Sequence, residues 1–357
     1  MNARPMTPMN PPAKPSTETR AQAITRLIAH IEDTLADLVP RDARLALLDF
    51  PDYDNIGDSA IYVGELAYLD SRGLKPSYVS LRNQPEAQDA RIADIVGDGP
   101  ILLQGGGNFG DLWPWFQPYR ERILTKYPGH PIVQFPQTLH FSSPQALGET
   151  ARIIERHGAF TLLVRDQRSF DLATRHFQCE VRLCPDMAFC MGPLSKAEPT
   201  KELLLHLRKD QEAAAPHDVS KLVGHASVLQ SDWPHQPDDF NRRIKWETLL
   251  IAAATGRIFE NRHSLKERYF RRQATKRLAR GTSLLSSART VVTDRLHGHI
   301  LCFLMDLPHV VLDNSYGKTS GFMQAWQTTA GSTYTAHSLD EAVALLKAHE
   351  GLALEAA

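Results

Sequence analysis

Short apolar runs alternate with helix-length segments along the first half of the chain. Six such runs lack strict polar alternation, which is typical of strands buried on both faces of a parallel sheet. They cover residues 45–50, 77–81, 101–104, 132–135, 161–165 and 181–184. A helix is predicted over 19–38, and Leu147, Ala151 and Ile154 form a helical stripe that ends at Gly158. Strand and helix in alternation predict a doubly wound α/β domain.

A shorter series of the same kind follows a break at residues 192–199, where glycine, proline and charged residues interrupt the pattern. Its predicted strands cover 202–207, 223–229, 290–293 and 310–313. A helix is predicted over 238–254, with Phe240, Ile244 and Ile251 on one face, and another begins at residue 296.

These two series divide the chain into two Rossmann-like domains, residues 19–195 and 196–357, after a proline-rich tail, residues 1–18, that we expect to be disordered. The second domain ends in a helix that opens with the capping-box spacing of Ser338 and Glu341. The predicted fold class is therefore α/β, with two Rossmann-like domains facing a central cleft where ligands bind.

The composition excludes several classes of protein. Of 357 residues, 42% are hydrophobic and 23% charged, so the chain is neither wholly disordered nor collagen-like nor a multi-span membrane protein. The formal net charge of -1 argues against a nucleic-acid partner. The tail lacks the apolar centre of a signal peptide. The four cysteines have no zinc-binding spacing and are expected to be buried thiols, so we predict a cytoplasmic protein.

The loop after the first strand, residues 52–59, holds three aspartates, an asparagine and a glycine ahead of a predicted helix. Loops at this end of a parallel sheet face the cleft. Asp54 and Asp58 are candidate general bases, and Asn55 is a candidate ligand for sugar hydroxyls. The alternative is a turn with Asp58 or Ser59 as the helix N-cap, which explains only part of the loop.

The loop after the third strand is glycine-rich, and Gly105, Gly106 and Gly107 are followed by Asn108. Consecutive glycines let backbone amides approach phosphate or carboxylate oxygens, so we assign these four residues to substrate binding. The bare dinucleotide-binding pattern is present, but no acidic residue follows at the required distance. The aromatic residues of the segment 113–116 suit either sugar stacking or a core.

Two further strand ends carry His140 and Arg165. The Arg165 guanidinium suits bidentate binding of a carboxylate or phosphate, and a structural pair with Asp166 is the alternative. His140 is a candidate catalytic residue, with a purely structural histidine as the alternative.

The segment 293–299 follows a strand of the second half and holds the densest cluster of reactive groups. It brings together Arg295, His297 and His299 at a strand-to-helix switch. Because no third metal ligand has suitable spacing, we assign this cluster to acid–base chemistry and anion binding rather than to a metal.

The segment 257–280 is strongly basic, with nine Lys or Arg against two Glu and with aromatic residues interleaved. Such a stretch suits docking on the anionic cytoplasmic face of the inner membrane, or binding the diphosphate of a lipid-linked acceptor. The alternative is a solvated helix face.

Taken in order, these segments resemble the polysaccharide pyruvyl transferase family. The resemblance spans about residues 45–325 and rests on residues 54–58, 104–111, 136–137, 164–166, 184–186, 293–299 and 314–318. It implies a glycosyltransferase-B-like fold and transfer of pyruvate from phosphoenolpyruvate onto two hydroxyls of a sugar in an exopolysaccharide or related surface glycan. The product would be a cyclic ketal, with release of phosphate. We expect no cofactor beside this donor substrate.

The resemblance also implies roles for individual residues. Arg295, Leu296 and His297 match the family segment that binds phosphoenolpyruvate, and Arg165 and His140 are carried over with them. We expect His297 to protonate the donor, with one aspartate of the loop 52–59 assisting the attacking hydroxyl. The remaining residues expected to bind substrate are His299, Tyr316 and Lys318.

Two other functions stay open on the sequence alone. A nucleotide-sugar glycosyltransferase would share the two-domain fold, although no acidic pair in the second half is placed to hold a nucleotide ribose. A non-enzymatic glycan-binding subunit would tolerate the loss of Arg295 and His297.

Overall fold

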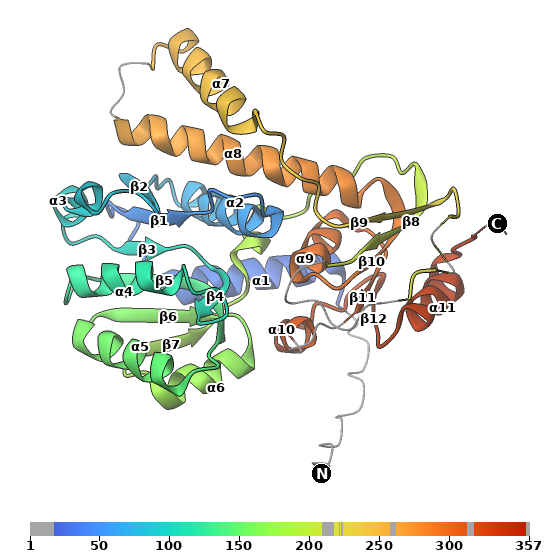
Figure 1. Ribbon diagram of the computed structural model, residues 1–357, viewed down its shortest axis with the longest axis horizontal. Coiled ribbons are helices and arrows are strands. Elements are labelled where there is room, and N and C mark those ends of the chain that lie inside the picture. Colours follow the sequence, from blue (N-terminus) through green and yellow to red (C-terminus); the bar gives the residue numbers. More distant parts are fainter. Residues whose placement is uncertain are drawn as a thin grey trace.

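Two parallel sheets form the centre of the molecule (Figure 1). The computed structural model describes residues 18–208, 218–220, 222, 224–257, 262–312 and 318–354. Every strand pairing in both sheets is parallel. The α/β class with Rossmann-like parallel sheets is therefore confirmed. Residues 1–17 of the predicted tail lie outside the described residues.

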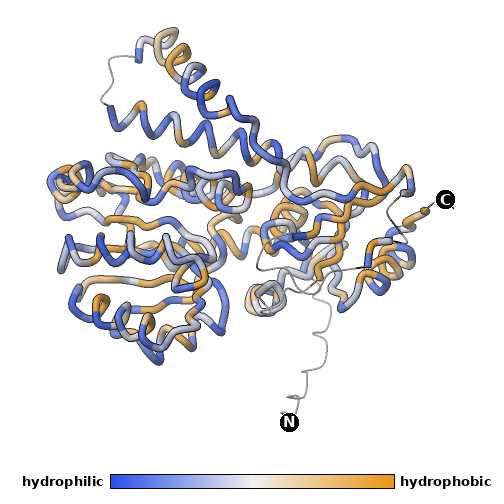
Figure 2. Tube along the Cα trace, viewed as in Figure 1, coloured by the Kyte–Doolittle hydropathy of each residue, from blue (hydrophilic) through white to orange (hydrophobic). Residues whose placement is uncertain are grey.

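The first sheet has the strand order β2-β1-β3-β5-β6-β7, and a further strand, β4, pairs with β5. Its strands are β1 (Ala46–Phe50), β2 (Tyr78–Leu81), β3 (Ile101–Leu103), β4 (Gly106–Gly110), β5 (Ile132–His140), β6 (Phe160–Val164) and β7 (Glu180–Leu183). The six predicted strands are confirmed, and β5 runs five residues beyond its predicted end. Figure 2 shows the hydrophobic character of these strands, which is why the apolar runs located them.

Helices flank the first sheet and connect its strands. They are α1 (Arg20–Leu35), α2 (Ile56–Ser71), α3 (Ile92–Val96), α4 (Gln117–Lys126), α5 (Pro144–His157) and α6 (Gln167–His176), with 3-10 turns at Glu86–Asp89 and Met187–Met191. The predicted stop of α5 is confirmed, because Gly158 adopts the left-handed conformation with φ of 77°.

The second sheet has the strand order β12-β11-β10-β8-β9. Its strands are β8 (Lys201–His206), β9 (Val228–Ser231), β10 (Ala288–Thr293), β11 (His309–Leu312) and β12 (Thr333–Ala336). The accompanying helices are α7 (Phe240–Ala254), α8 (Arg262–Leu285), α9 (Leu296–Met305), α10 (Lys318–Trp326) and α11 (Leu339–Glu350). The predicted cap of the last helix is present, since the Ser338 hydroxyl accepts from the Glu341 amide. β12 was not predicted.

Two helices tie the halves of the chain together. α8 crosses above both sheets, and its Phe270 stacks on Phe50 of β1 with ring centroids 4.1 Å apart (Figure 1). Arg20 of α1 donates to the carbonyls of Phe303 and Leu304 in α9. One buried apolar cluster runs through β1, α2, α8 and α9, so packing holds the facing edges of the sheets in a fixed relation. The boundary at residue 195 stays a prediction.

Two other sequence expectations concern helices and thiols. Within the part of the chain that the structure describes, no helix is both long and apolar enough to cross a membrane. Cys184 and Cys302 are buried as free thiols, while Cys179 and Cys190 are partly buried. Burial raises the pKa of Cys179 to about 12, so this thiol is unreactive at neutral pH.

Candidate active site

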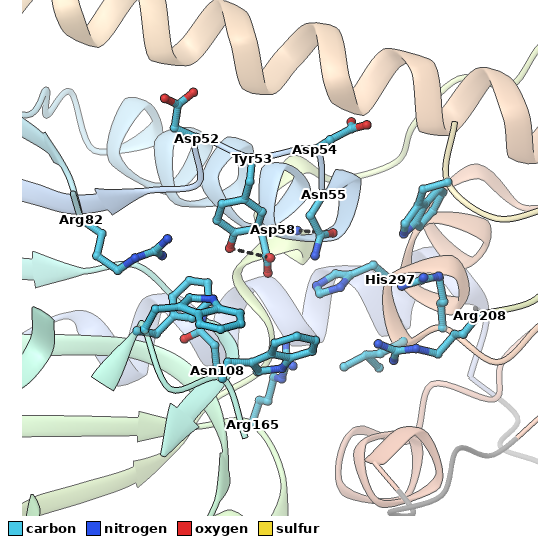
Figure 3. A pocket seen from close by; sticks show the side chains of 17 residues that line it. Asp52, Tyr53, Asp54, Asn55, Asp58, Arg82, Asn108, Arg165, Arg208 and His297 are labelled. Atoms are coloured by element: carbon cyan, nitrogen blue, oxygen red, sulfur yellow. Dashed lines mark hydrogen bonds between the residues drawn. The ribbon is translucent and has the colours of Figure 1, made fainter. Parts of the chain in front are cut away.

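A cavity of about 440 Å³ lies where loops from both sheets meet (Figure 3). Its walls come from the β1–α2 loop, β4, the segment after β4, the end of β6 and the start of α9. The lining residues are Asp52, Tyr53, Asp54, Asn55, Asp58, Arg82, Gly107, Asn108, Trp113, Trp115, Phe116, Arg165, Arg208, Trp233, Arg295, Leu296 and His297. Nine of the residues assigned to the site from sequence thus share one cavity, as expected for strand-end loops.

The start of α2 forms one wall. Asn55 is the N-cap, and its side-chain oxygen accepts from the amides of Gly57 at 2.9 Å and Asp58 at 3.4 Å. Neither Asp58 nor Ser59 is the cap, so the alternative interpretation of this loop is wrong. Asp58 is left to point into the cavity, where its Oδ2 accepts from the Tyr53 hydroxyl at 2.8 Å (Figure 3).

Asp54 is engaged differently from Asp58. Its carboxylate accepts from the Gln236 amide and lies 3.6 Å from the Arg280 guanidinium. These contacts tie the β1–α2 loop to the second half of the chain. Of the two predicted bases, Asp58 is therefore the one directed at the cavity centre (Figure 3).

The glycine-rich segment is not the open anion-binding loop that the sequence predicted. Residues 106–110 form β4, and Gly105 is buried with its amide donating to Glu65 at 2.8 Å. The Asn108 amide donates to the Gln137 side chain at 3.1 Å. Because these amides are already satisfied, the segment meets the cavity only through Gly107 and Asn108.

Three charged side chains converge at the floor of the cavity. Arg165 donates from Nη1 to Asp186 Oδ2 at 2.5 Å and from Nε to Thr138 at 3.0 Å. The same Asp186 oxygen lies 3.5 Å from His297 Nε2. Arg165 and Asp186 are 2% and 1% exposed, so little water screens this cluster. The partner of Arg165 is thus Asp186 and not Asp166, which instead caps α6.

Asp186 is held ionised by this cluster. Burial acts to raise the pKa of its carboxyl, but the neighbouring His297 and Arg165, together with the Ala188 amide, outweigh burial and hold that pKa well below its usual range.

Arg295 stands beside His297 and is oriented by a carboxylate of its own. Its Nε and Nη2 donate to the two oxygens of Asp232 at 2.6 and 2.7 Å. Burial acts to raise the pKa of Asp232, and Arg295 outweighs it, so the net direction is downward. A bidentate pair fixes the plane of the guanidinium, so the cavity wall has a defined shape here.

His297 is packed tightly against the start of α2. A Cβ atom added to Gly57 would lie 2.5 Å from His297 Nδ1 and 2.9 Å from its Cγ. The absence of a side chain at residue 57 therefore lets the imidazole enter the cavity between α2 and Asp186.

Aromatic rings form the opposite end of the cavity. The rings of Trp113 and Trp115 are 6.3 Å apart, and Trp115 is 58% exposed at the rim. Arg82 lies over the Phe116 ring at 4.0 Å, and Tyr53 meets the same ring edge-on. Trp113, Trp115 and Phe116 thus line the cavity, although Phe116 is itself buried, and their rings suit a sugar ring.

Two residues assigned from sequence, His140 and His299, lie outside this cavity. His140 lines a neighbouring cavity of about 470 Å³ and is not among the residues around His297. His299 is fully buried, between His309 and Thr328, so its assignment to substrate binding is corrected. Tyr316 lies outside the described residues, and Lys318 begins α10, with its side chain also outside them.

Several cavity residues were missed by sequence reasoning. Arg82, Arg208 and Trp233 line the cavity, and Asp186 and Asp232 pair with its lining residues Arg165 and Arg295. Asp186 could have been found from the sequence, because it belongs to the segment 184–186 that contributes to the resemblance to the polysaccharide pyruvyl transferase family. The others come from loops without a distinguishing pattern. Among the described residues, no group of three metal-binding side chains is present.

The comparison with known families decides among the remaining alternatives. Residues 55–316 match the family described as polysaccharide pyruvyl transferase. The chain belongs to this family. The enzyme is thus a polysaccharide pyruvyl transferase, which transfers pyruvate to glycans, and the nucleotide-sugar alternative is not favoured.

Individual relatives align with most of the chain. Pyruvyl transferase 1 of Schizosaccharomyces pombe is 31% identical over 318 residues, which are 85% of this chain and 75% of that protein. EpsO of Bacillus subtilis is 30% identical over 305 residues, which are 84% of this chain and 90% of that protein. The crystal structure of a Klebsiella pneumoniae protein of uncharacterised function has the same fold, with a TM-score of 0.57 at 17% identity over 87% of this chain and 99% of that chain.

Proposed function

We propose that the enzyme transfers the pyruvyl group of phosphoenolpyruvate to two hydroxyls of a sugar in an exopolysaccharide repeat unit or related surface glycan, as a cyclic ketal. The observation that carries the proposal is the convergence of Arg165, Asp186 and His297 at one end of a cavity whose other end is aromatic. One end suits a small anion and the other a sugar ring.

The charged end matches the donor in size and charge. Phosphoenolpyruvate carries a phosphate and a carboxylate on three carbons, so it needs several cations close together. Arg165, Arg208 and Arg295 all line the cavity, and guanidinium groups bind both anions by paired hydrogen bonds. Asp186 and Asp232 fix two of these guanidiniums in place.

The proposed reaction begins with proton transfer from His297 to C3 of the donor. The double bond electrons form the new C–H bond, and C2 gains cationic character. One sugar hydroxyl adds to C2 and gives its proton to Asp58. The bond from C2 to the phosphate oxygen then breaks, and phosphate leaves with the electron pair and takes that proton. The neighbouring hydroxyl adds to C2, closes the ketal and returns a proton to His297.

The aromatic end would hold the acceptor. Trp113, Trp115 and Phe116 offer ring faces to the apolar side of a sugar, while Asn108 and Asp58 offer hydrogen-bonding groups. A lipid-linked oligosaccharide fits the same arrangement, because the exposed rim at Trp115 leaves room for a longer chain.

The proposal extends to setting and cofactor. The transfer changes no oxidation state overall, so it requires no redox cofactor. The free cysteines suit a reducing compartment, and we place the reaction in the cytoplasm. The two sheets meeting at one cavity suit a glycosyltransferase-B-like arrangement.

Phosphate release tests the proposal directly. We expect the enzyme to release phosphate from phosphoenolpyruvate only when a suitable glycoside is present, and the glycoside to gain the mass of a pyruvate ketal. A panel of simple glycosides is compared with a nucleotide-sugar control. Turnover of the nucleotide-sugar alone would overturn the proposal.

A further inference from the structure

The helical hairpin of α7 and α8 lies at the edge of the molecule (Figure 1), and α7 exposes large apolar side chains. Among the described residues, four large apolar side chains are strongly exposed, and Trp115 of the cavity is one of them. The other three are on α7: Trp246 is 62% exposed, Leu250 66% and Ile251 47%. Of the residues that the sequence placed on one face of this helix, Phe240 and Ile244 are buried and Ile251 is exposed.

The exposed residues of α7 combine apolar and cationic side chains on one side of the helix. Residues spaced by three or four share a helix face, and Trp246 has Leu250 on one side and Arg242 and Arg243 on the other. Lys245 flanks them, and all five side chains are exposed. We call these five residues the α7 outer face. Figure 2 shows hydrophilic colour in the first turns of α7 and hydrophobic colour further along.

The basic residues of α8, by contrast, are largely engaged within the chain. Arg271 pairs with Asp70 at 2.6 Å, and Arg277 is fully buried, with Nη1 donating to the Pro51 carbonyl at 2.7 Å. Arg280 donates to the Pro234 carbonyl. The charge that made the segment 257–280 basic therefore serves mainly to attach α8 to the rest of the chain. Lys276 of α8 is still 54% exposed. On α7, Arg242, Arg243 and Lys245 are all exposed, and Arg243 lies 4.0 Å from Asp239.

We propose that the α7 outer face docks on the surface of a bilayer that contains anionic phospholipid. Trp and Leu on one helix face, flanked by Arg and Lys, have the composition of helices that lie in the membrane interface. The aromatic and aliphatic side chains enter the boundary between headgroups and acyl chains, while the cations contact the lipid phosphates.

Charge favours a lipid surface over a second copy of the chain as the occupant. A symmetric contact between two α7 outer faces would bring Arg242, Arg243 and Lys245 of both copies into one interface, and like charges repel when water is excluded. An anionic bilayer neutralises the same three side chains. The proposal concerns a surface remote from the cavity and does not depend on the donor or acceptor.

Vesicle flotation of the full-length protein tests this docking. We expect the protein to float with vesicles of phosphatidylcholine mixed with phosphatidylglycerol, and not with phosphatidylcholine alone. The double variant Trp246→Gln/Leu250→Gln and the triple variant Arg242→Gln/Arg243→Gln/Lys245→Gln should each reduce the floated fraction at least about tenfold. Binding should weaken as salt is raised.

A matched triple variant controls for loss of net charge. Arg152→Gln/Arg156→Gln/Arg175→Gln removes three exposed cations from α5 and α6, far from α7 (Figure 1), and should float as the unmodified protein does. Circular dichroism checks that each variant is folded. Two results would overturn the proposal: no flotation of the unmodified protein, or a dimer in light scattering that the Trp246→Gln/Leu250→Gln change dissociates without any vesicle binding.

Discussion

Asp186 and His297 meet across the two halves of the chain, with the carboxylate Oδ2 3.5 Å from the imidazole Nε2. Asp186 follows β7 of the first sheet. His297 lies in the first turn of α9, which follows β10 of the second sheet. The same carboxylate oxygen accepts from Arg165. One buried anion therefore orients the proposed acid and a proposed donor-binding cation at once, and the site forms only when both halves are packed together.

Replacing Asp186 by Asn should separate positioning from folding. Asp186→Asn keeps the shape of the side chain and removes its charge, so His297 and Arg165 lose the anion that orients both. We expect kcat to fall at least about tenfold. Loss of a buried ionic partner also destabilises the fold, by about 3–5 kcal/mol.

The control for this change is Asp306→Asn, since Asp306 pairs with Arg20 but is 60% exposed. It should leave kcat unchanged. A wild-type kcat in folded Asp186→Asn would show that Asp186 does not position His297 for catalysis.

His297→Ala should affect the chemical step more than donor binding. General acid catalysis contributes about a hundredfold to ten-thousandfold, so kcat for phosphate release should fall by that amount, with a smaller change in KM for phosphoenolpyruvate. The exposed His176 at the end of α6 provides a control, as His176→Ala should have wild-type kinetics. Near wild-type kcat in His297→Ala would mean that another group is the acid.

Gly57→Ala tests the close packing between α2 and His297. The added methyl group would lie 2.5 Å from His297 Nδ1, so the imidazole must move. A displacement of about 1 Å at a catalytic group lowers kcat on the order of a hundredfold. In α5, Gly148 has no neighbour within 4 Å of the position a Cβ would take.

Gly148→Ala is therefore the matched control, and it should raise stability by about 0.5–1 kcal/mol with no effect on kcat. Full activity in Gly57→Ala would mean that His297 can move without loss of catalysis. That result would contradict the proposed role of His297 as a positioned acid.

The sequence predicted most strands because their apolar runs are long enough to show burial on both faces. It missed β4 and β12, which contain Gly106–Gly110 and Thr333–Ala336, because glycine and polar residues carry no such signal. Their places are set by pairing with β5 and β11. Tertiary context thus overrode local preference at these two strands.

The site was predicted as far as strand-end loops determine it. Asp58, Arg165 and His297 follow directly from that rule, whereas Asp232 meets Arg295 from 63 residues away and no local pattern announces it. His299 was misassigned because its spacing from His297 was read as a functional pair. Its helix α9 is apolar almost throughout, which is the sequence signal of a buried position.

Trp115 should contribute to acceptor binding alone. Its ring stands at the cavity rim beside Trp113, and Trp115→Ala removes a stacking surface worth about 0.5–1.5 kcal/mol beyond area burial. We expect KM for the glycoside to rise about tenfold and KM for phosphoenolpyruvate to stay constant. Trp115→Phe retains a ring and should restore most of the affinity. If KM for the glycoside and KM for phosphoenolpyruvate rose equally, Trp115 would not be specific to acceptor binding.

Two buried histidines should make the fold sensitive to acid. His299 Nδ1 lies 2.9 Å from His309 Nε2, and both side chains are buried. Burial lowers the pKa of His309 to about 4 and that of His299 well below its ordinary value, with the neighbouring His309 adding to the effect at His299. In the unfolded chain each histidine titrates near about 6.5. The unfolded state therefore binds more protons as the pH falls below that value.

The stability due to the neutral pair is thus fully present above about pH 6.5 and is lost as the pH falls toward about 4, by about 1.4 kcal/mol per pH unit for each histidine. Urea unfolding across this window should show the decline, and His309→Gln should reduce its slope by the share of one histidine. The exposed His176 provides the control, and His176→Gln should keep the wild-type slope. An unchanged slope in His309→Gln would mean that His309 is already protonated in the folded protein, and its contact with His299 would then have to rearrange on acidification.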